Sequence, residues 1–528
     1  MTLRRLGLSA LCLSLTLGGT TAVATPPTEH LPLGPANLTE TRDTRTLQPG
    51  VTLTTIVRGQ NDTTAGWTVE VSIPSSSPDP DAPAAALSDQ AGANKAADKL
   101  RAAGLDPRVE NVPTPRLADA GGDSLGYRVR LGLFATKAEA DALRTKVIAA
   151  GLNGSSLYTG WDGEPDDIAG STGPWHVQVL TIDPKKFHGT LDATYGQDIE
   201  QRETTSTLAT LTGATAAVNA GFFVLDPKSG APGDPAGIGV YDGRLVSEPT
   251  NGRPALVLGP RGTSVDRFTW RGEVRGVGKP LPLDGLNRVP GLIRNCGGTA
   301  DDLPTAKPMH DTTCTDPDEL IAFDASYAAL TPSGPGAEVI LDRHGKVTAV
   351  RTSRGGAIPE GGRTVQAIGA MVAPLLAAAK VGKSLSIRST LLDDHGRPVP
   401  LSRRTTIVNG GPELVRNGRI HATAAADGMV QDTPSFYYGW VHKRNPRTIA
   451  GVDDHGRTVL ITADGRNVNS LGLSISEAAA VAKSFHLREA INLDGGGSTT
   501  MVADGTVLNT PSDAAGERPV GDALVITK

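Results

Sequence analysis

Glu489-Ala-Ile-Asn-Leu-Asp-Gly-Gly-Gly-Ser-Thr-Thr-Met501 is the stretch around which the rest of the chain is organised. An apolar strand runs into Asp494, three glycines remove every side chain from the following turn, and a run of hydroxyl residues begins the returning strand. Three consecutive glycines are costly to order, so a purely structural turn would use one or two. Exposed amides in such a turn form a concavity that favours an anion. The stretch therefore predicts two strands joined by an anion-binding turn; a flexible turn without a ligand is the alternative.

Length and charge set the broad class of protein. A chain of 528 residues exceeds one ordinary domain, which predicts two or three units. Charged residues make up 20% of the chain and the formal net charge is -5, so neither sign dominates. This balance gives no reason to expect a nucleic acid as the partner.

The N-terminus has the pattern of an export signal. Met1-Thr-Leu-Arg-Arg5 is charged, an apolar run follows from Leu6 to Leu17, and Ala22-Val-Ala24 forms an Ala-x-Ala cleavage site. We therefore predict a signal peptide over residues 1–24, with cleavage after Ala24. No other stretch approaches about 18 uninterrupted apolar residues. The mature protein is predicted to be secreted and not to be an integral membrane protein.

Two cysteines, Cys296 and Cys314, remain once the leader with Cys12 is removed. In an oxidising compartment a pair at this spacing most simply forms a disulfide. A metal site is the less favoured alternative, because only His310 lies close by in the sequence.

Residues 66–161 repeat one pattern twice. Each half reads strand, helix, strand, which predicts a ferredoxin-like βαββαβ sheet with helices on one face. The predicted elements, in chain order, are Trp67–Ile73, Leu87–Ala103, Pro107–Val112, Tyr127–Phe134, Thr136–Ala150 and Ser155–Thr159.

This segment resembles the SPOR domain family. The resemblance lies in Tyr127-x-Val-x-x-Gly-x-Phe134, followed by Thr136-x-x-Glu139-Ala140, with Arg130 where the family often has Gln. It implies binding to peptidoglycan glycan strands that lack stem peptides. An insert without a ligand is the alternative.

The SPOR-like segment is expected to interrupt a larger domain. An alternating strand at 51–57 precedes it without a local partner, and a second strand begins after it at 175–182. The predicted divisions are a signal peptide (1–24), an N-terminal tail with a strand that pairs with the large domain (25–65), a SPOR-like domain (66–161), a linker (162–174) and the large domain (175–528).

The large domain combines many strands and Gly- and Asp-rich turns with few helices. Its clearest helix is Ile475 to Phe485, where Ser474 and Glu477 fit a Ser-x-x-Glu capping box. Glu477 is therefore expected to cap this helix.

Four polar clusters follow strand ends in this domain: Asn219-Ala-Gly-Phe-Phe223, Arg444-Asn-Pro-Arg447-Thr448, Asp464-Gly-Arg466 and Asn492 to Ser498. In this order they resemble the phosphodiester glycosidase family, as does the closing stretch Pro511–Pro519, and the resemblance covers residues 175–528. Ala220 stands where the family has Gly. The resemblance implies a hydrolase that cuts N-acetylglucosamine or a similar sugar from a phosphodiester. The fold class is then α+β: a β-rich mixed α/β catalytic domain plus the small ferredoxin-like domain.

The clusters suit a sugar phosphodiester physically. Arginines can grip phosphate oxygens in forked, charge-assisted hydrogen bonds. Asp464 and Asp494 are the candidate acid, base or nucleophile, since glycosidic cleavage normally uses a carboxyl pair. The candidate substrate- and phosphate-binding residues are Asn219, Arg444, Arg447, Thr448, Arg466, Gly495, Gly496, Gly497, Ser498 and Thr499. Taken singly, each also has an ordinary structural explanation, such as a hairpin turn at Asp464 or surface cations around Pro446.

Further polar residues are assigned no chemistry. Glu413, His421 and Asp427 could line the same cleft, but a turn followed by a strand explains them better. No cofactor or metal is predicted, because the histidines lack metal spacing such as His-Glu-x-x-His. The acidic turns at Asp301-Asp302 and Asp311 to Asp318 could hold calcium but lack EF-hand spacing.

The leading hypothesis is therefore a secreted, cell-wall-associated glycosidase that hydrolyses the anomeric sugar–phosphate bond of a glycosyl phosphodiester. Its partners would be the substrate and peptidoglycan glycan strands, held through the SPOR-like segment. A non-catalytic wall protein that binds an anionic glycan is one alternative. A glycoside hydrolase acting on peptidoglycan itself is the other.

Overall fold

The structure, a computed structural model, describes residues 30–73, 86–163, 170–250, 252–296, 299, 301–303, 308–430 and 433–528. The predicted signal peptide lies outside the described residues. From Leu31 to Lys528 the chain forms one compact unit.

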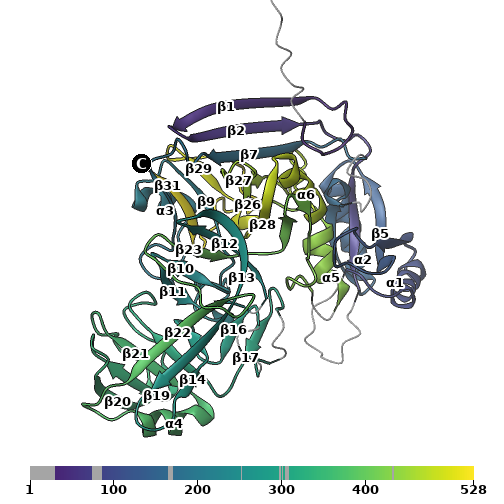
Figure 1. Cartoon of the computed structure of the whole chain (residues 1–528). Coiled ribbons are helices and arrows are strands. Elements are labelled where there is room, and N and C mark those ends of the chain that lie inside the picture. The colour runs from purple at the N-terminus through teal and green to yellow at the C-terminus, as the bar shows by residue number, and fades with distance from the viewer. Residues whose placement is uncertain are drawn as a thin grey trace, which may run out of the picture. The chain divides into compact units, whose positions relative to one another are not determined.

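An eight-stranded antiparallel sheet, β1-β2-β7-β27-β26-β28-β24-β25, carries much of the core (Figure 1). Its inner strands are buried on both faces and read as continuous apolar runs, as in Thr458-Val-Leu-Ile-Thr-Ala463. The strands, in chain order, are β1 (Glu40–Gln48), β2 (Val51–Arg58), β7 (Trp175–Ile182), β24 (Glu413–Arg416), β25 (Arg419–Ile420), β26 (Arg447–Asp453), β27 (Thr458–Ala463) and β28 (Leu487–Asn492).

The SPOR-like segment lies between two neighbouring strands of this sheet. β2 pairs with β7 along its whole length, from Val51 opposite Ile182 to Arg58 opposite Trp175. The chain therefore leaves the sheet after β2, forms the insert, and returns to the adjacent position.

The insert is a four-stranded sheet in the order β4-β5-β3-β6 with two helices. Apolar residues on alternate positions of β3 and β5, such as Val69 and Val129, pack against both helices. The helix that follows β5 begins with the capping box Thr136–Glu139. The predicted βαββαβ order is confirmed, with β3 (Trp67–Ser72), α1 (Gln90–Ala102), β4 (Pro107–Pro113), β5 (Ser124–Phe134), α2 (Lys137–Ala149) and β6 (Asn153–Tyr158).

A five-stranded sheet, β30-β29-β9-β31-β8, packs beside the eight-stranded one and shares its apolar core. Its strands are β8 (Thr190–Thr194), β9 (Ala216–Asn219), β29 (Met501–Ala503), β30 (Thr506–Val507) and β31 (Ala523–Thr527), with α3 (Thr205–Thr212) packed against β9 and β31.

Two further sheets and a hairpin complete the described fold. The first comprises β10 (Gly239–Tyr241), β11 (Arg244–Ser247), β12 (Pro254–Gly259), β13 (Gly262–Arg275), β14 (Leu281–Leu283), β22 (Ser386–Asp393) and β23 (Thr406–Asn409). The second comprises β15 (Gly285–Leu286), β18 (Leu320–Phe323), β19 (Gly334–Leu341), β20 (Val347–Arg354) and β21 (Arg363–Ala367), with α4 (Val372–Ala378) packed against β19. The hairpin is β16 (Leu292–Arg294) with β17 (Thr313–Thr315). Strands contain 41% of the residues and helices contain 15%, which confirms the β-rich α+β class.

One strand departs from the sequence prediction. β1 pairs antiparallel with β2, so the early strand has a local partner after all. Most of β1 is exposed on both faces, and its sequence therefore lacks the apolar alternation that reveals a half-buried strand.

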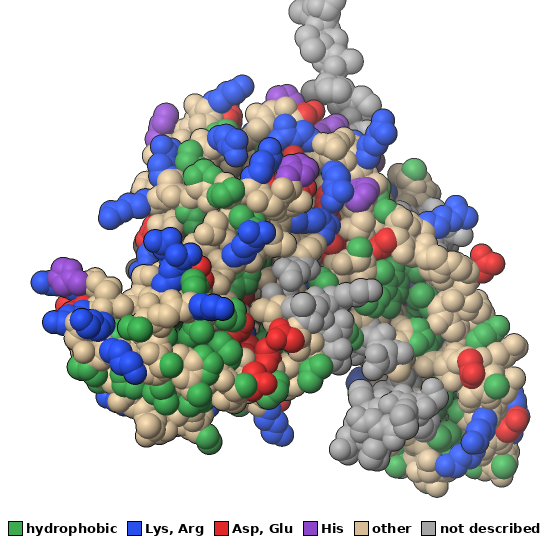
Figure 2. Space-filling model, turned by 60° about the horizontal axis from the view of Figure 1, so that its bottom comes forward, with side chains coloured by type: hydrophobic (Ala, Val, Ile, Leu, Met, Phe, Trp, Pro, Cys, Tyr) green, Lys and Arg blue, Asp and Glu red, His purple; other side chains and the backbone are tan. Residues whose placement is uncertain are grey.

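Three expectations about covalent structure, surface charge and helices can be compared directly. Cys296 and Cys314 form the predicted disulfide, with their Cα atoms 5.1 Å apart. On the face shown in Figure 2, basic side chains are spread among neutral and acidic ones and do not form one patch. Within the described ranges, every helix is too short or too polar to cross a membrane.

Candidate active site

Strand ends bring the four polar clusters together. β26 begins at Arg447, which lies opposite Ala463 at the end of β27, and Asn492 at the end of β28 lies opposite Ile449. Asn219 ends β9 of the neighbouring five-stranded sheet. The candidate site is therefore built where one end of the eight-stranded sheet meets one end of the five-stranded sheet.

Asn219 is the centre of the hydrogen-bond network. It is fully buried, and its Nδ2 donates to the carbonyl of Asp494 at 2.7 Å. Its Oδ1 accepts from the Thr448 hydroxyl at 2.7 Å and from the Thr500 amide at 3.1 Å. The Thr448 hydroxyl also lies 3.5 Å from that of Thr499. Asn219 thus holds the main chain around Asp494.

The glycine turn is closed by its own hydrogen bonds. The Gly495 amide donates to Asp494 Oδ1 at 2.9 Å, and the Gly496 amide to the Pro446 carbonyl at 3.0 Å. The amides of Ser498 and Thr499 donate to carbonyls within the turn. These four amides are therefore occupied within the protein, unlike the open anion concavity expected from the sequence.

The glycines make room for arginines. A Cβ atom at Gly496 would lie 3.2 Å from both terminal nitrogens of Arg466, and one at Gly497 would collide with Arg518 and Asp513. Bare backbone is therefore required because two guanidinium groups pack directly against the turn.

Arg466 is the exposed cation of the cluster. Its Nε and Nη2 donate to Asn445 Oδ1 at 3.1 and 3.0 Å, and its backbone lies in the left-handed region at φ 56°. Burial of the guanidinium and the nearby Arg518 lower the pKa of Arg466, while Asp513 and Asp494 raise it. The Asn445 contact fixes the guanidinium and leaves Nη1 for a ligand.

Arg447 is fully buried and mostly occupied. Its Nε donates to the Leu473 carbonyl at 2.9 Å, and Nη2 donates to the carbonyls of Trp440 and Lys443. Among the described residues, Nη1 has no hydrogen-bond partner. Burial and the nearby Arg466 together lower the pKa of Arg447 to about 9, although Glu477 raises it.

Arg444 does not join the cluster. Its guanidinium pairs with Glu477 at 2.7 to 3.0 Å and donates to the Gly160 carbonyl at 3.0 Å. Glu477 also closes the capping box with Ser474 at the start of α6 (Ile475–Ser484), as predicted. The structure therefore places Arg444 in a buried structural ion pair.

Asp494 is partly exposed, and its carboxylate lies close enough to Arg466 and Arg518 to interact with both. Its amide donates to the Ala220 carbonyl at 2.9 Å, which ties it to the first cluster. Burial raises the pKa of Asp494 to about 6, although the Ser498 hydroxyl and Arg518 lower it. It is the predicted carboxylate best placed to meet a ligand.

Asp464 is more deeply buried. Both of its carboxylate oxygens accept from the Thr510 amide at 3.1 Å. The adjacent Asn509 side chain donates to the Thr499 carbonyl at 2.9 Å, which links Asp464 to the turn. Burial raises the pKa of Asp464 to about 6, although the Thr510 amide and Asn509 lower it.

Asp522 is a third carboxylate, which sequence reasoning missed. It accepts the Gly221 amide and the Tyr241 hydroxyl, each at 2.7 Å, and its carbonyl accepts the Ala220 amide at 3.2 Å. Burial raises the pKa of Asp522 to about 6, and its charge raises the pKa of Asp494. The only sequence signal is a lone Gly-Asp before the last strand.

The segment 409–427 supports the site without entering it. Asn409 exchanges hydrogen bonds with both main-chain groups of Phe222 at 2.9 and 3.1 Å. Glu413 and Asp427 both pair with Arg267. Their carboxylates are thus neutralised within the protein.

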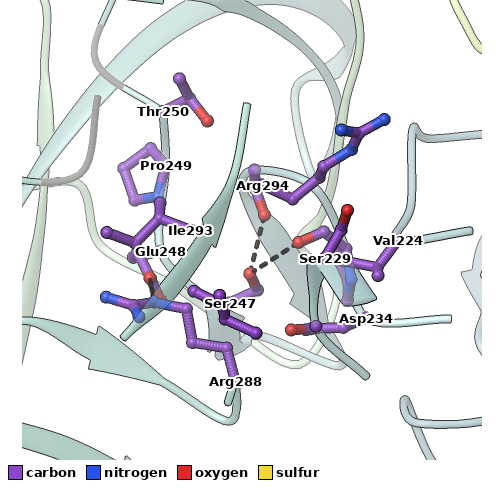
Figure 3. A pocket seen from close by; sticks show the side chains of 14 residues that line it. Val224, Ser229, Asp234, Ser247, Glu248, Pro249, Thr250, Arg288, Ile293 and Arg294 are labelled. Atoms are coloured by element: carbon purple, nitrogen blue, oxygen red, sulfur yellow. Dashed lines mark hydrogen bonds and ion pairs between the residues drawn. The ribbon is translucent and has the colours of Figure 1, made fainter. Parts of the chain in front are cut away.

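A small polar cavity lies beside Val224, close to the first cluster (Figure 3). Asp234, Glu248, Arg288 and Arg294 are among its lining residues. Its volume is about 20 Å³, enough for a single water molecule and too small for a sugar.

Among the described residues, two groups have metal-ligating atoms close together: Asp453, Asp454 and His455, and Asp301, Asp302 and Asp316. Neither group includes a candidate site residue. The second contains the Asp301-Asp302 turn considered for calcium.

Comparisons with known proteins agree with both resemblances. The sequence profile of the family described as phosphodiester glycosidase matches residues 335–527, and that of the SPOR domain matches residues 84–157. Both matches fall inside the predicted segments 175–528 and 66–161, whose limits stay predictions.

Curated relatives are similar over one part of the chain. The N-acetylglucosamine-1-phosphodiester alpha-N-acetylglucosaminidase of Mus musculus is 36% identical over 117 residues, covering 22% of each protein. The Homo sapiens protein of the same name is 37% identical over 110 residues, covering 20% of this chain and 21% of the relative. The chain thus spans about a fifth of the curated relatives it matches.

A solved structure is similar over nearly the whole chain. It is a protein described as exported, from Burkholderia pseudomallei K96243, and it is 33% identical with a TM-score of 0.83. The match covers 96% of this chain and 99% of that one. The arrangement of insert and large domain is therefore shared as a unit.

Proposed function

The chain belongs to the phosphodiester glycosidase family and carries a SPOR domain, and from this premise we propose that it hydrolyses the anomeric carbon–phosphate oxygen bond of a glycosyl phosphodiester. The products would be a free sugar and a phosphomonoester. The observation that carries the proposal is the partly exposed Asp494 with Arg466 and Arg518 packed against the adjoining turn.

Arg466 is assigned to bind the phosphate. The residue is exposed and its guanidinium is already oriented by Asn445, so it can receive a phosphate oxygen without first being ordered. Arg518 adds positive charge beside it, and the buried Arg447 adds a further positive charge nearby. Charge that develops on the departing phosphate is stabilised by these groups in the transition state.

Asp494 and Asp464 are proposed as the catalytic carboxylates. A phosphomonoester leaves as a stable anion, with a second pKa of about 6, so protonation of the leaving group matters little. The carboxylates are then needed in their ionised form, Asp494 facing the anomeric carbon as nucleophile or electrostatic partner. Asp464 either stabilises the positive charge of the oxocarbenium-like transition state or activates the attacking water.

The substrates are proposed to be attached to cell walls. The SPOR domain is a peptidoglycan-binding module, the N-terminal sequence fits an export signal, and the relative from Burkholderia pseudomallei is described as exported. We therefore propose wall-linked phosphodiesters, such as teichoic-acid-type polymers, linkage units or sugar-capped phosphates, with N-acetylglucosamine as the first sugar to test.

The test is release of free sugar from a synthetic N-acetylglucosamine-1-phosphodiester, beside a panel of other glycosyl phosphodiesters. We expect turnover with the wild type, and in Asp494→Asn we expect binding to persist while turnover disappears. No free sugar from any member of the panel would overturn the proposal. Reducing sugars released only from walls stripped of phosphate polymers would instead indicate a peptidoglycan hydrolase.

A further inference from the structure

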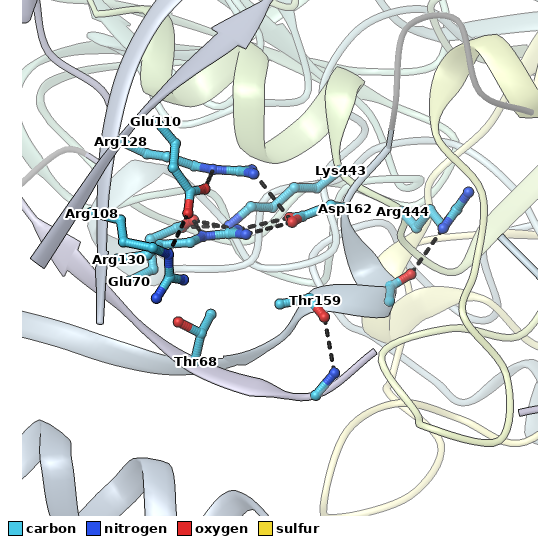
Figure 4. A network of polar contacts seen from close by, with 12 residues as sticks. Thr68, Glu70, Arg108, Glu110, Arg128, Arg130, Thr159, Asp162, Lys443 and Arg444 are labelled. Atoms are coloured by element: carbon cyan, nitrogen blue, oxygen red, sulfur yellow. Dashed lines mark hydrogen bonds and ion pairs between the residues drawn. The ribbon is translucent and has the colours of Figure 1, made fainter. Parts of the chain in front are cut away.

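The two faces of the SPOR sheet have different contacts. α1 and α2 pack on one face, and the opposite face carries a network of charged side chains that meets the large domain (Figure 4). Glu70 of β3 and Arg130 of β5 form its centre, with Asp162 just beyond β6. On the large-domain side the contact is made by Tyr438 and Lys443. Tyr438 begins a π-helical turn (Tyr438–His442) that follows α5 (Pro434–Tyr437), and Lys443 comes directly after that turn.

Glu70 is the acceptor at which the two domains join. It receives Arg130 Nη2 at 2.7 Å, the Tyr438 hydroxyl at 2.8 Å and Lys443 Nζ at 2.6 Å. Burial alone raises the pKa of Glu70, but the attraction of Lys443 and Arg130 lowers it to about 2. Removing one partner from such a buried pair is strongly destabilising, because the other charge is left uncompensated.

A second contact lies at the far end of the insert. The Trp161 carbonyl accepts the Arg444 amide at 2.9 Å, and the Trp161 indole donates to the Asn467 carbonyl at 3.3 Å. These two partners flank the clusters at Arg447 and Arg466. The insert therefore touches both loops that present the phosphate-binding arginines.

Lys443 connects the docking contact to those arginines. Its side chain pairs with Glu70, while its main-chain carbonyl accepts Asn445 Nδ2 at 3.1 Å and Arg447 Nη2 at 3.5 Å. Asn445 in turn accepts both hydrogen bonds that orient Arg466. Only Asn445 separates the interdomain ion pair, Glu70 with Lys443, from the exposed Arg466 of the site.

We propose that the docked SPOR domain is a working part of the phosphate-binding site, and that Lys443, held by Glu70, is the positioning residue for Arg466 and Arg447. The inference rests on the proposed function for its kinetic consequence. Wall attachment and phosphate recognition are then properties of one docked assembly. A displacement of the SPOR sheet moves the arginine-bearing loop with it.

The kinetic test compares Lys443→Met with Lys137→Met in the full chain, on the N-acetylglucosamine-1-phosphodiester. Lys137 forms an exposed ion pair with Asp141 inside the SPOR domain and is the matched control. Because Arg466 stabilises charge that develops on the departing phosphate, a displaced Arg466 should act on the chemical step, and we expect kcat to fall about tenfold or more in Lys443→Met, with KM changed much less. Lys137→Met should match the wild type.

The second readout does not need turnover. Hydrogen exchange of the amides at Arg444 and Asn445, which donate to Trp161 and Leu473, reports the position of the loop directly. We expect these amides to exchange at least about tenfold faster in Lys443→Met and to be unchanged in Lys137→Met. If these amides exchange faster in Lys443→Met but neither the wild type nor any variant turns over substrate, the positioning role is supported and the proposed hydrolysis is rejected.

Unchanged exchange at both amides in Lys443→Met, with kcat as in the wild type, would overturn the inference. Should that variant fail to fold, Tyr438→Phe removes the hydroxyl that donates to Glu70 while keeping every charge. The same amides should then exchange faster by about threefold. Equal exchange in Tyr438→Phe and wild type would likewise overturn it.

Discussion

The side chain of Asn219 donates a 2.7 Å hydrogen bond to the main-chain carbonyl of Asp494, 275 positions later in the chain. The same side chain accepts from Thr448 and Thr500, so one buried amide joins three of the polar clusters. The position of Asp494 relative to the phosphate-binding arginines therefore depends on a residue that need not touch the substrate.

Asn219→Ala should damage both stability and turnover. It leaves the Asp494 carbonyl, the Thr448 hydroxyl and the Thr500 amide without their partner, and each unsatisfied buried group costs about 1–3 kcal/mol. We expect a clearly lower Tm and a fall in kcat of at least about tenfold. Asn469→Ala, at an exposed position, is the control. A variant with normal kcat would show that Asn219 does not hold the site.

Turnover should depend on pH near 6. Burial raises the pKa values of Asp464 and Asp494 to about 6, and the proposed mechanism needs both carboxylates ionised. We therefore expect kcat/KM to rise as pH increases through 6 and to level off above it. A rate that instead falls as pH rises through 6 would mean that a protonated carboxyl is required.

Asp522→Asn should shift that profile. The charge of Asp522 raises the pKa of Asp494, so its removal should lower the Asp494 pKa and move the rising limb to lower pH. The isosteric amide keeps an acceptor for the Gly221 amide. The pH profiles of kcat/KM for the two proteins provide the measurement, and coincident midpoints would contradict the assigned coupling.

Asp522 should also make the stability of the fold depend on pH. Burial raises the pKa of Asp522 to about 6, so the folded state binds its proton more tightly than the unfolded state. Its contribution is fully present below the unfolded pKa of about 3.9 and is lost as pH rises through 6, about 2 to 3 kcal/mol in all. We expect the free energy of unfolding, measured in urea at pH 4.5 and at pH 7, to fall less between the two pH values in Asp522→Asn than in the wild type. An equal loss would count against this role.

The order of the clusters along the chain could be predicted from the sequence, but the partners of their side chains could not. Short motifs at strand ends predict a shared site because antiparallel neighbours bring their ends together, as Arg447 and Ala463 do. Arg444 has the same local context as Arg447. Its partner Glu477 is 33 positions away, so a single motif could not show that Arg444 is occupied.

Other features left no periodic signal. β1 is exposed on both faces, and Asp522 is one acidic residue before an ordinary buried strand. The glycine turn was recognised, but its purpose was not: close packing of Arg466 against the turn, not free amides, explains why side chains are absent. Contacts between residues far apart in sequence decide the last two, Asp522 and the glycine turn.

Gly497→Ala should reduce turnover through sterics alone. A Cβ atom there would collide with Arg518 and Asp513, whereas the backbone at Gly497 is not in the left-handed region. We expect a kcat/KM at least about tenfold lower, with a small change in Tm. Gly121→Ala, where a Cβ meets open space, is the matched control. Normal kcat/KM in Gly497→Ala would mean that Arg518 can move without consequence.

Arg466 and Arg444 should separate catalysis from stability. Arg466→Met removes the guanidinium that would stabilise the departing phosphate, and we expect kcat to fall about 10²- to 10³-fold with little change in Tm.

Arg444→Met breaks a buried ion pair and leaves Glu477 uncompensated, which should cost about 3–5 kcal/mol of stability. Because Arg444 also donates to the Gly160 carbonyl, a smaller kinetic effect of about tenfold or less should accompany it. Urea unfolding and kcat measured per folded molecule on both variants decide the matter. If Arg444→Met instead loses turnover as severely as Arg466→Met while keeping its stability, Arg444 belongs to the phosphate-binding set, and its pairing with Glu477 must open when substrate binds.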